Sequence, residues 1–100
     1  MNKSLIIYEY PVALYDVYHW IERFKEKITK LTKLNWFEKD YFEIELKNNE
    51  YEEKVTICSF EHLLTGAFNK KDFYKIVIIG RVPTENKKIM NILKELLYNE

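Results

Sequence analysis

The sequence predicts an α+β protein in which helices cover a β-sheet. Two hydrophobic periods carry this prediction: residues 12–31 repeat apolar side chains every three or four positions, and residues 41–47 alternate. A chain of 100 residues has the common size of one domain, so we expect a single α+β domain over residues 1–100. Apolar residues make up 47% of the chain, well above the range of disordered proteins.

Residues 5–10 form the first expected strand, because they are rich in β-favouring side chains and end at Pro11. The period of three and four then predicts one long helix over residues 12–31. We expect Trp36 and Phe37 to pack the following connection onto the core. The apolar face of the helix would consist of Leu14, Val17, Tyr18, Ile21, Phe24, Ile28 and Leu31.

Two further strands are expected to form a hairpin. Residues 41–47 alternate between apolar and polar side chains, as in a strand with one wet face. Residues 48–50 are Asn, Asn and Glu, which favour a turn, and residues 54–59 then alternate again. The hairpin follows from this pairing of strand, turn and strand.

The rest of the chain predicts a short helix, a strand and a last helix. Ser59 can cap a short helix that ends at a left-handed Gly66, and a longer strand is the alternative. Residues 73–82 form the strongest strand, and the apolar run 76–79 indicates cover on both of its faces. The Pro-Thr pair at 83–84 is expected to begin the last helix.

The expected order is therefore β-α-β-β-(α)-β followed by a C-terminal helix. This order predicts a four-stranded, mostly antiparallel sheet of the ferredoxin-like kind. The first helix would cover one face of the sheet, and the C-terminal helix would cover the other face or extend past an edge. Because unrelated functions share this fold, the fold alone does not indicate a function.

The composition limits the classes of partner. Lys plus Arg and Asp plus Glu both number 16, so no net charge attracts the protein to nucleic acid. Cys58 is the single cysteine, which excludes an intrachain disulfide, and neither a secretory signal nor a membrane-spanning run is apparent. We therefore expect a cytoplasmic protein with no cofactor and no membrane contact.

The choice of charged residues bears on the source of the protein. Glu outnumbers Asp thirteen to three, Lys outnumbers Arg fourteen to two, and Gln is absent. Enrichment in Lys and Glu is a trend of hyperthermophiles. Eight Asn and many Ile, Tyr and Phe equally describe an A+T-rich gene. A thermophile, a virus or another mobile element are the sources that we keep as expectations.

The polar side of the long expected helix carries residue types that dominate protein interfaces. Tyr15, His19 and Arg23 recur there at four-residue steps, and Trp20 lies at the border of the apolar stripe. These side chains would contact a protein partner or a second copy of the chain. The alternative is that the bordering aromatic belongs to the rim of the core. Aromatic residues make up 16% of the chain, which favours an interface or a homodimer.

A nucleic-acid interface would combine aromatic residues on the sheet with a local basic patch. Tyr8 and Tyr10 on the first strand are the candidate stacking residues. The expected third strand lacks the aromatic residues of such sheets, and both tyrosines packing beneath the C-terminal helix is the alternative. The candidate phosphate contacts are Lys70, Lys71, Lys75 and Arg81.

Residue clusters typical of enzymes are sparse. Cys58 and His62 have a spacing that would suit a thiolate nucleophile on a helix, although a cysteine in a β-like run is usually a buried hydrophobe. Glu43 and Glu45 would suit Mg²⁺ in a nuclease-like enzyme, or a charged edge that blocks strand pairing. Together with His19 these residues show no spacing that requires a metal, so we assign no catalytic and no metal-binding residue.

The first functional hypothesis is a small binding protein that acts through a protein interface. A small nucleic-acid-binding protein is the second hypothesis, and a metal-dependent, nuclease-like enzyme is the third. Balanced charge favours a protein partner over nucleic acid, and the lack of ligand motifs disfavours an enzyme.

Overall fold

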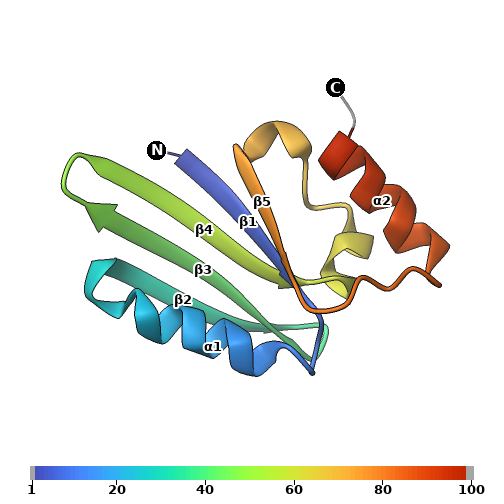
Figure 1. Ribbon diagram of the computed structural model, residues 1–100, viewed down its shortest axis with the longest axis horizontal. Coiled ribbons are helices and arrows are strands. Elements are labelled where there is room, and N and C mark those ends of the chain that lie inside the picture. Colours follow the sequence, from blue (N-terminus) through green and yellow to red (C-terminus); the bar gives the residue numbers. More distant parts are fainter. Residues whose placement is uncertain (1, 99–100) are drawn as a thin grey trace.

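The computed structural model describes residues 2–98, which fold around one five-stranded mixed sheet (Figure 1). Its strand order is β2-β3-β4-β1-β5. Within the described residues, three 3₁₀ helices connect the longer elements: η1 (Lys25–Lys27), η2 (Glu61–Thr65) and η3 (Lys70–Asp72). The longer elements are β1 (Asn2–Tyr8), α1 (Leu14–Arg23), β2 (Ile28–Trp36), β3 (Lys39–Asn48), β4 (Tyr51–Ser59), β5 (Lys75–Ile79) and α2 (Lys87–Tyr98).

The sheet topology corrects the ferredoxin-like prediction. β1 runs parallel to β4 on one side and parallel to β5 on the other, so Ile6 lies opposite both Ile57 and Val77. β2, β3 and β4 form an antiparallel meander beside this parallel part. The prediction of a four-stranded, mostly antiparallel sheet is therefore wrong, because the sheet gains a fifth strand and is mixed.

The extra strand is β2, residues 28–36, of which we expected 28–31 to continue the first helix and the rest to form a connection. α1 ends at Arg23, and after η1 the chain turns back as β2. Ile28, Thr29 and Thr32 are β-branched, which restricts their side chains in a helix and suits a pleated strand. Pairing with β3 along almost its whole length then stabilises β2 as a strand.

A two-residue turn joins β2 to β3. Phe37 and Glu38 both have positive φ, 52° and 62°, as the turn of a tight hairpin requires. Phe37 is exposed because it lies at the tip of this turn, so the expectation that it packs onto the core is wrong. Trp36 does pack inwards, with its ring stacked on that of His62 at 4.9 Å between centroids.

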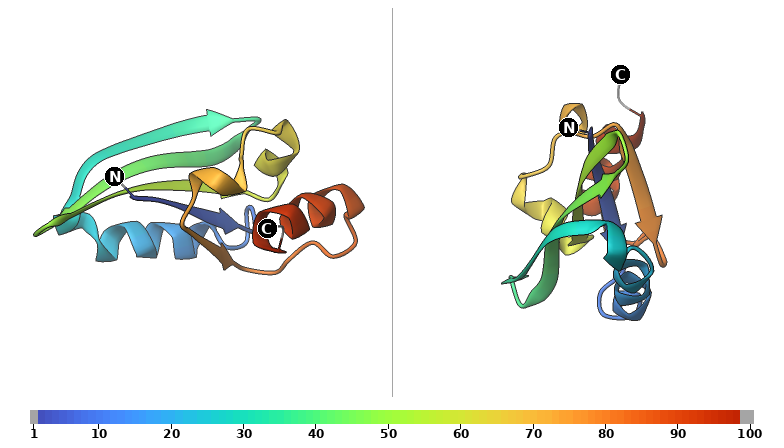
Figure 2. Two further views of the ribbon diagram at one scale, coloured as in Figure 1. Left: turned by 90° about the horizontal axis from the view of Figure 1, so that it is seen from above. Right: turned by 90° about the vertical axis from the view of Figure 1, so that its left-hand side faces the viewer.

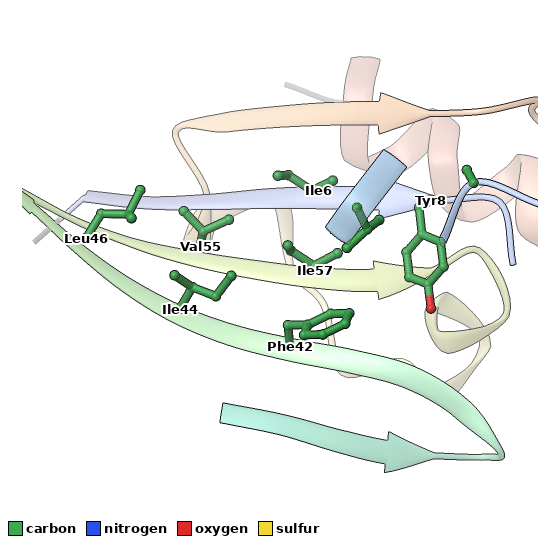
Figure 3. Close-up of a cluster of buried hydrophobic side chains, with 9 residues drawn as sticks. Ile6, Tyr8, Phe42, Ile44, Leu46, Val55 and Ile57 are labelled. Carbon is green, nitrogen blue, oxygen red and sulfur yellow. The ribbon is translucent and has the colours of Figure 1, made fainter. Parts of the chain in front are cut away.

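Hydrophobic clusters lie on both faces of the sheet. The cluster beneath α1 includes Val17 of that helix and the side chains drawn in Figure 3. The cluster on the other face joins α2, through Ile89 and Leu93, to η2 through Leu63. Figure 2 shows α1 on one side of the strands and η2 on the other. Of the two positions left open for the C-terminal helix, the structure has the one in which α2 packs on the face opposite α1.

Several local predictions hold and one needs correction. β3 and β4 form the expected hairpin, and Gly66 ends η2 in left-handed conformation with φ 75°. The run 76–79 of β5 packs into both clusters, so its two-sided cover is confirmed. α2 begins at Lys87, later than expected, because Asn86 Oδ1 accepts a hydrogen bond from the backbone N–H of Ile89 and caps the helix.

Candidate protein-binding surface

α1 presents one stripe of exposed aromatic side chains. Tyr15, Tyr18 and His19 are three and four residues apart, so they lie on one side of the helix. Tyr15 is 72% exposed and Tyr18 is 40% exposed. The rings of Tyr15 and His19 meet edge to face, with centroids 4.5 Å apart. Together with Ile21 and Glu22, the stripe lines a shallow hollow of about 340 Å³.

Tyr18 connects this stripe to the sheet. Its hydroxyl donates a hydrogen bond of 3.1 Å to Oδ2 of Asp40, and its ring meets that of Phe42 edge to face. The ammonium of Lys33 lies 5.6 Å from the centre of the same ring and 3.8 Å from the Asp40 carboxylate. The hydrogen bond with Tyr18, followed in size by the negative charge of Asp40, raises the pKa of Lys33. These contacts tie α1 to β2 and β3 and hold the stripe in place.

Of the residues predicted for this surface, Trp20 lies apart from the stripe, whereas Arg23 lies one helical turn beyond His19. Trp20 is half-buried against the cluster beneath α1, and its ring centroid lies 4.8 Å from that of Phe24. The geometry thus fits the alternative that this tryptophan belongs to the rim of the core. Arg23 is exposed at the C-terminal end of α1. The structure brings together Tyr15 and His19 and adds Tyr18, which the helical period had assigned to the apolar face.

β2 extends the surface to the edge of the sheet. It is the terminal strand and pairs with β3 alone, so one row of its backbone groups faces outward. Leu31 and Leu34 are each 48% exposed, and their odd spacing puts them on opposite faces of the strand. Leu31 lies opposite Ile44, a residue of the cluster beneath α1, and so belongs to the same side as the stripe.

The lysines of β2 have acidic neighbours on β3. Lys33 pairs with the Asp40 carboxylate, as described above, and Lys30 lies opposite Glu45 in the strand register. These acidic neighbours are important because an unbalanced lysine on an edge strand commonly prevents pairing with another strand. Here the positive charges of the edge are balanced within the chain.

Glu43 and Glu45, the candidate Mg²⁺ ligands, face lysine as well. Glu45 lies opposite Lys54 in the register, and Glu43 forms an ion pair of 3.5 Å with the same lysine. Among residues 2–98, no group of three or more His, Cys, Asp or Glu side chains is placed to hold a metal ion. The arrangement therefore gives the nuclease-like hypothesis no geometric support.

His62 and Cys58 are buried structural residues. The backbone N–H of Ser59 donates to Nδ1 of His62 at 2.9 Å, and Nε2 lies 2.7 Å from the carbonyl oxygen of Trp36. A neutral imidazole with its proton on Nε2 satisfies both contacts. Burial lowers the pKa of His62 and raises the pKa of Cys58, so both groups stay uncharged. The fully buried Ser59 hydroxyl beside Nδ1 faces no solvent and forms no usable nucleophile.

The tyrosines proposed to stack on bases are occupied within the protein. Tyr8 is fully buried, and its hydroxyl donates a hydrogen bond of 2.6 Å to the carbonyl oxygen of Asp40. It packs beneath α1 and not beneath the C-terminal helix, so the alternative position given for it is wrong. Tyr10 is half-buried beside it, with the Lys39 ammonium 5.6 Å from the centre of its ring. Burial removes Tyr8 from the candidate nucleic-acid contacts.

The basic residues proposed to contact phosphate do not form one patch. Lys70 and Lys71 belong to η3, and Lys75 begins β5. Arg81 follows the opposite end of β5, where it forms an ion pair of 3.4 Å with Glu85. The length of β5 therefore separates the arginine from the three lysines.

A hydrogen-bonded cluster near the β3–β4 turn was not predicted from the sequence. Tyr51 and Tyr74 both donate to the carboxylate of Glu53, and their hydroxyl oxygens are 3.1 Å apart. The hydrogen bond to Glu53 raises the pKa of Tyr51. Tyr74 lies just before β5, whereas Tyr51 and Glu53 lie on β4. Because these residues are far apart in the sequence, no local pattern indicates the cluster. The two tyrosine hydroxyls supply hydrogen bonds to the nearly buried carboxylate of Glu53, so the cluster has a structural role.

No protein-family model, curated protein or solved structure matches the chain significantly. In the part of the chain that the structure describes, no helix has the length and apolar character needed to cross a bilayer. The interpretation of the α1 stripe and the β2 edge therefore depends on their own geometry.

Proposed function

We propose that this protein is a small binding protein that holds a protein partner on the α1–β2 surface, formed by Tyr15, Tyr18, His19 and Leu31. The observation that carries the proposal is the exposure of large apolar side chains on these two neighbouring elements. Tyrosine supplies a large contact area with few rotatable bonds, so ordering it in an interface costs little entropy. A partner that covered the two tyrosines would gain on the order of 1 kcal/mol from each.

The surface also suits a partner held by shape and apolar contact. The stripe is preorganised, because Tyr18 is fixed by Asp40 and Phe42 before any partner arrives. The chain has no net charge, so long-range attraction contributes little to the encounter. We therefore expect binding that changes little with salt, unlike the steep salt dependence of a phosphate-binding protein.

The position of the basic residues at two ends of β5 favours a protein partner over nucleic acid. We also propose that the protein is cytoplasmic and comes from a virus or mobile element. Both of these statements depend on composition alone. The partner class is accordingly a protein, with a second copy of the chain included.

A capture experiment with matched variants tests the proposal. The wild type, a Tyr15→Ser/His19→Ser double variant and a Tyr98→Ser control are immobilised and exposed both to a lysate of the source cells and to untagged copies of the chain. Tyr98 is 76% exposed on α2, away from α1 (Figure 1), so it controls for loss of any surface tyrosine. Circular dichroism confirms that each variant is folded.

The expected result is a protein, or the chain itself, that the wild type and the control retain and the double variant loses. Equal retention by all three proteins would contradict the proposed surface. The same conclusion would follow if none of the three retained anything.

A further inference from the structure

We propose that β2 binds the β2 strand of a second copy of this chain, antiparallel and about a two-fold axis at Thr32. The inference rests on the proposed function, because it assigns an occupant to the β2 side of the α1–β2 surface. It goes further by naming the partner, the backbone pairing and the register.

β2 leaves a long edge of the sheet open. β2 has nine residues, so its free edge is about 30 Å long. The other edge strand, β5, has five. A long exposed edge is a template for another strand, and proteins usually block it with proline, a central bulge or charge. β2 contains no proline, its irregularity lies at its N-terminal end, between Ile28 and Lys30, and the charges of its two lysines are balanced by acidic residues of β3.

A register centred on Thr32 keeps like charges apart. With the axis at Thr32, Lys30 lies opposite the partner's Leu34, and Leu31 lies opposite the partner's Lys33. Moving the axis to either lysine would place that lysine opposite itself. Thr32 is also the midpoint of β2, so this register pairs all nine residues, with Ile28 opposite the partner's Trp36.

The same register gives the exposed side chains of β2 compatible neighbours. Residues directly opposite each other share a face of the sheet, so the half-exposed Leu31 and Leu34 would each lie beside a lysine of the other copy. The methylene chain of lysine can cover leucine while its ammonium stays in water. Lys33 can do this and remain near Asp40 of its own chain. A central pair of threonines is itself a favourable cross-strand contact.

Such pairing would join the two sheets into one continuous sheet. Because the axis stands perpendicular to the sheet, both copies of α1 would lie on the same face. The aromatic stripes of the two copies would then flank the junction, one on each side. This arrangement links the edge strand and the stripe in a single assembly.

Cysteine cross-linking tests the register. Two thiols introduced by Thr32→Cys would face each other with Cα atoms about 4.5–5.5 Å apart, which is within disulfide range. The thiols of the control Asn35→Cys would lie about 20 Å apart along the strands. We expect a disulfide-linked dimer from the first variant under mild oxidation and none from the second. Equal cross-linking of both would overturn the register.

A charge series on one position tests the pairing without cysteine. Leu34→Lys would place a lysine opposite the partner's Lys30 at both symmetric contacts, whereas Leu34→Glu would place an acid there. We expect light scattering to give a dimer mass for the wild type and for Leu34→Glu. For Leu34→Lys we expect at least a tenfold weaker dimer. Equal dimer affinity of the two variants would overturn strand pairing.

Failure of this inference can be told apart from failure of the proposed function. A dimer that ignores both Leu34 variants but is lost in Tyr15→Ser/His19→Ser overturns the strand pairing and leaves the α1 stripe as the binding surface. If the wild type is a monomer and captures another protein through the stripe, the strand pairing is likewise overturned and the stripe remains the binding surface. A monomer without variant-sensitive capture overturns both proposals.

Discussion

The hydroxyl of Tyr18 on α1 donates a hydrogen bond of 3.1 Å to the carboxylate of Asp40 on β3. This contact joins the candidate binding helix to the antiparallel part of the sheet, next to the edge strand. It turns an exposed aromatic stripe into a surface of defined shape. Binding of a partner on the α1–β2 surface depends on that rigidity.

Removing this hydroxyl should loosen the stripe with little effect on the core. We expect Tyr18→Phe to lower the free energy of unfolding by about 0.5–1 kcal/mol, because the ring keeps its contact with Phe42 while the hydrogen bond is lost. Urea unfolding measures the change. Tyr15→Phe is the control, since it removes a hydroxyl from a ring that is mostly in water, and a loss as large as that of Tyr18→Phe would contradict the prediction.

The buried His62 should make stability depend on pH. Its pKa is lowered from 6.5 in the folded protein, chiefly by burial, so protonation favours the unfolded state. The free energy of unfolding should therefore be at its full value above about pH 6.5 and should fall as the pH is lowered below that value. Urea unfolding between about pH 8 and about pH 5 measures the slope. His62→Gln should be less stable at neutral pH and should show a shallower slope, whereas an unchanged slope would exclude His62 as its source.

The two tyrosines that donate to Glu53 should act together. Tyr51→Phe and Tyr74→Phe each remove one donor from a nearly buried carboxylate, and each should cost about 1 kcal/mol. A double-mutant cycle should give a coupling energy of at least about 0.5 kcal/mol, because both hydroxyls share one acceptor. Tyr98→Phe combined with Tyr74→Phe is the control. Additive losses in both cycles would show that the cluster is not coupled.

The two glycines should differ in their tolerance of a side chain. A Cβ at Gly80, whose φ is 98°, would lie 2.7 Å from Cβ of Glu9 and 3.2 Å from Cβ of Ala13. Gly66 has φ 75° and open space around it. We expect Gly66→Ala to cost about 1 kcal/mol for its backbone conformation alone, and Gly80→Ala to cost clearly more. Equal losses in thermal unfolding would show that the contact with Glu9 relaxes freely.

The sequence predicts the parts of this fold that have a strong local period. The alternation over residues 41–47 and the short helix ended by Gly66 both appear in the structure. Residues 28–31 were assigned to the first helix because Phe24, Ile28 and Leu31 continue its three- and four-residue steps, and the rest of β2 was expected to be a connection. In an edge strand with both faces partly exposed, alternation is weak, and only pairing with β3 reveals the strand.

The candidate surface was predictable in part for the same reason. The four-residue step from Tyr15 to His19 correctly placed both on one exposed side of a helix. Tyr18 was assigned to the core and Trp20 to the interface. Both residues lie at the border of the helical stripe, where burial depends on how the neighbouring strands pack and not on the helical period. The position of β1 between β4 and β5 likewise depends on contacts between distant residues, such as Ile6 with Ile57, which no local period contains.

The measurement that tests the central claim most directly is hydrogen–deuterium exchange of the backbone amides at low and high protein concentration. If two copies bind through β2, amides of residues 28–36 should exchange more slowly as the concentration rises, while amides of β5 stay unchanged. The Leu34→Lys variant should lose this dependence. Exchange of β2 that is independent of concentration in the wild type would contradict the binding of a second copy at this edge.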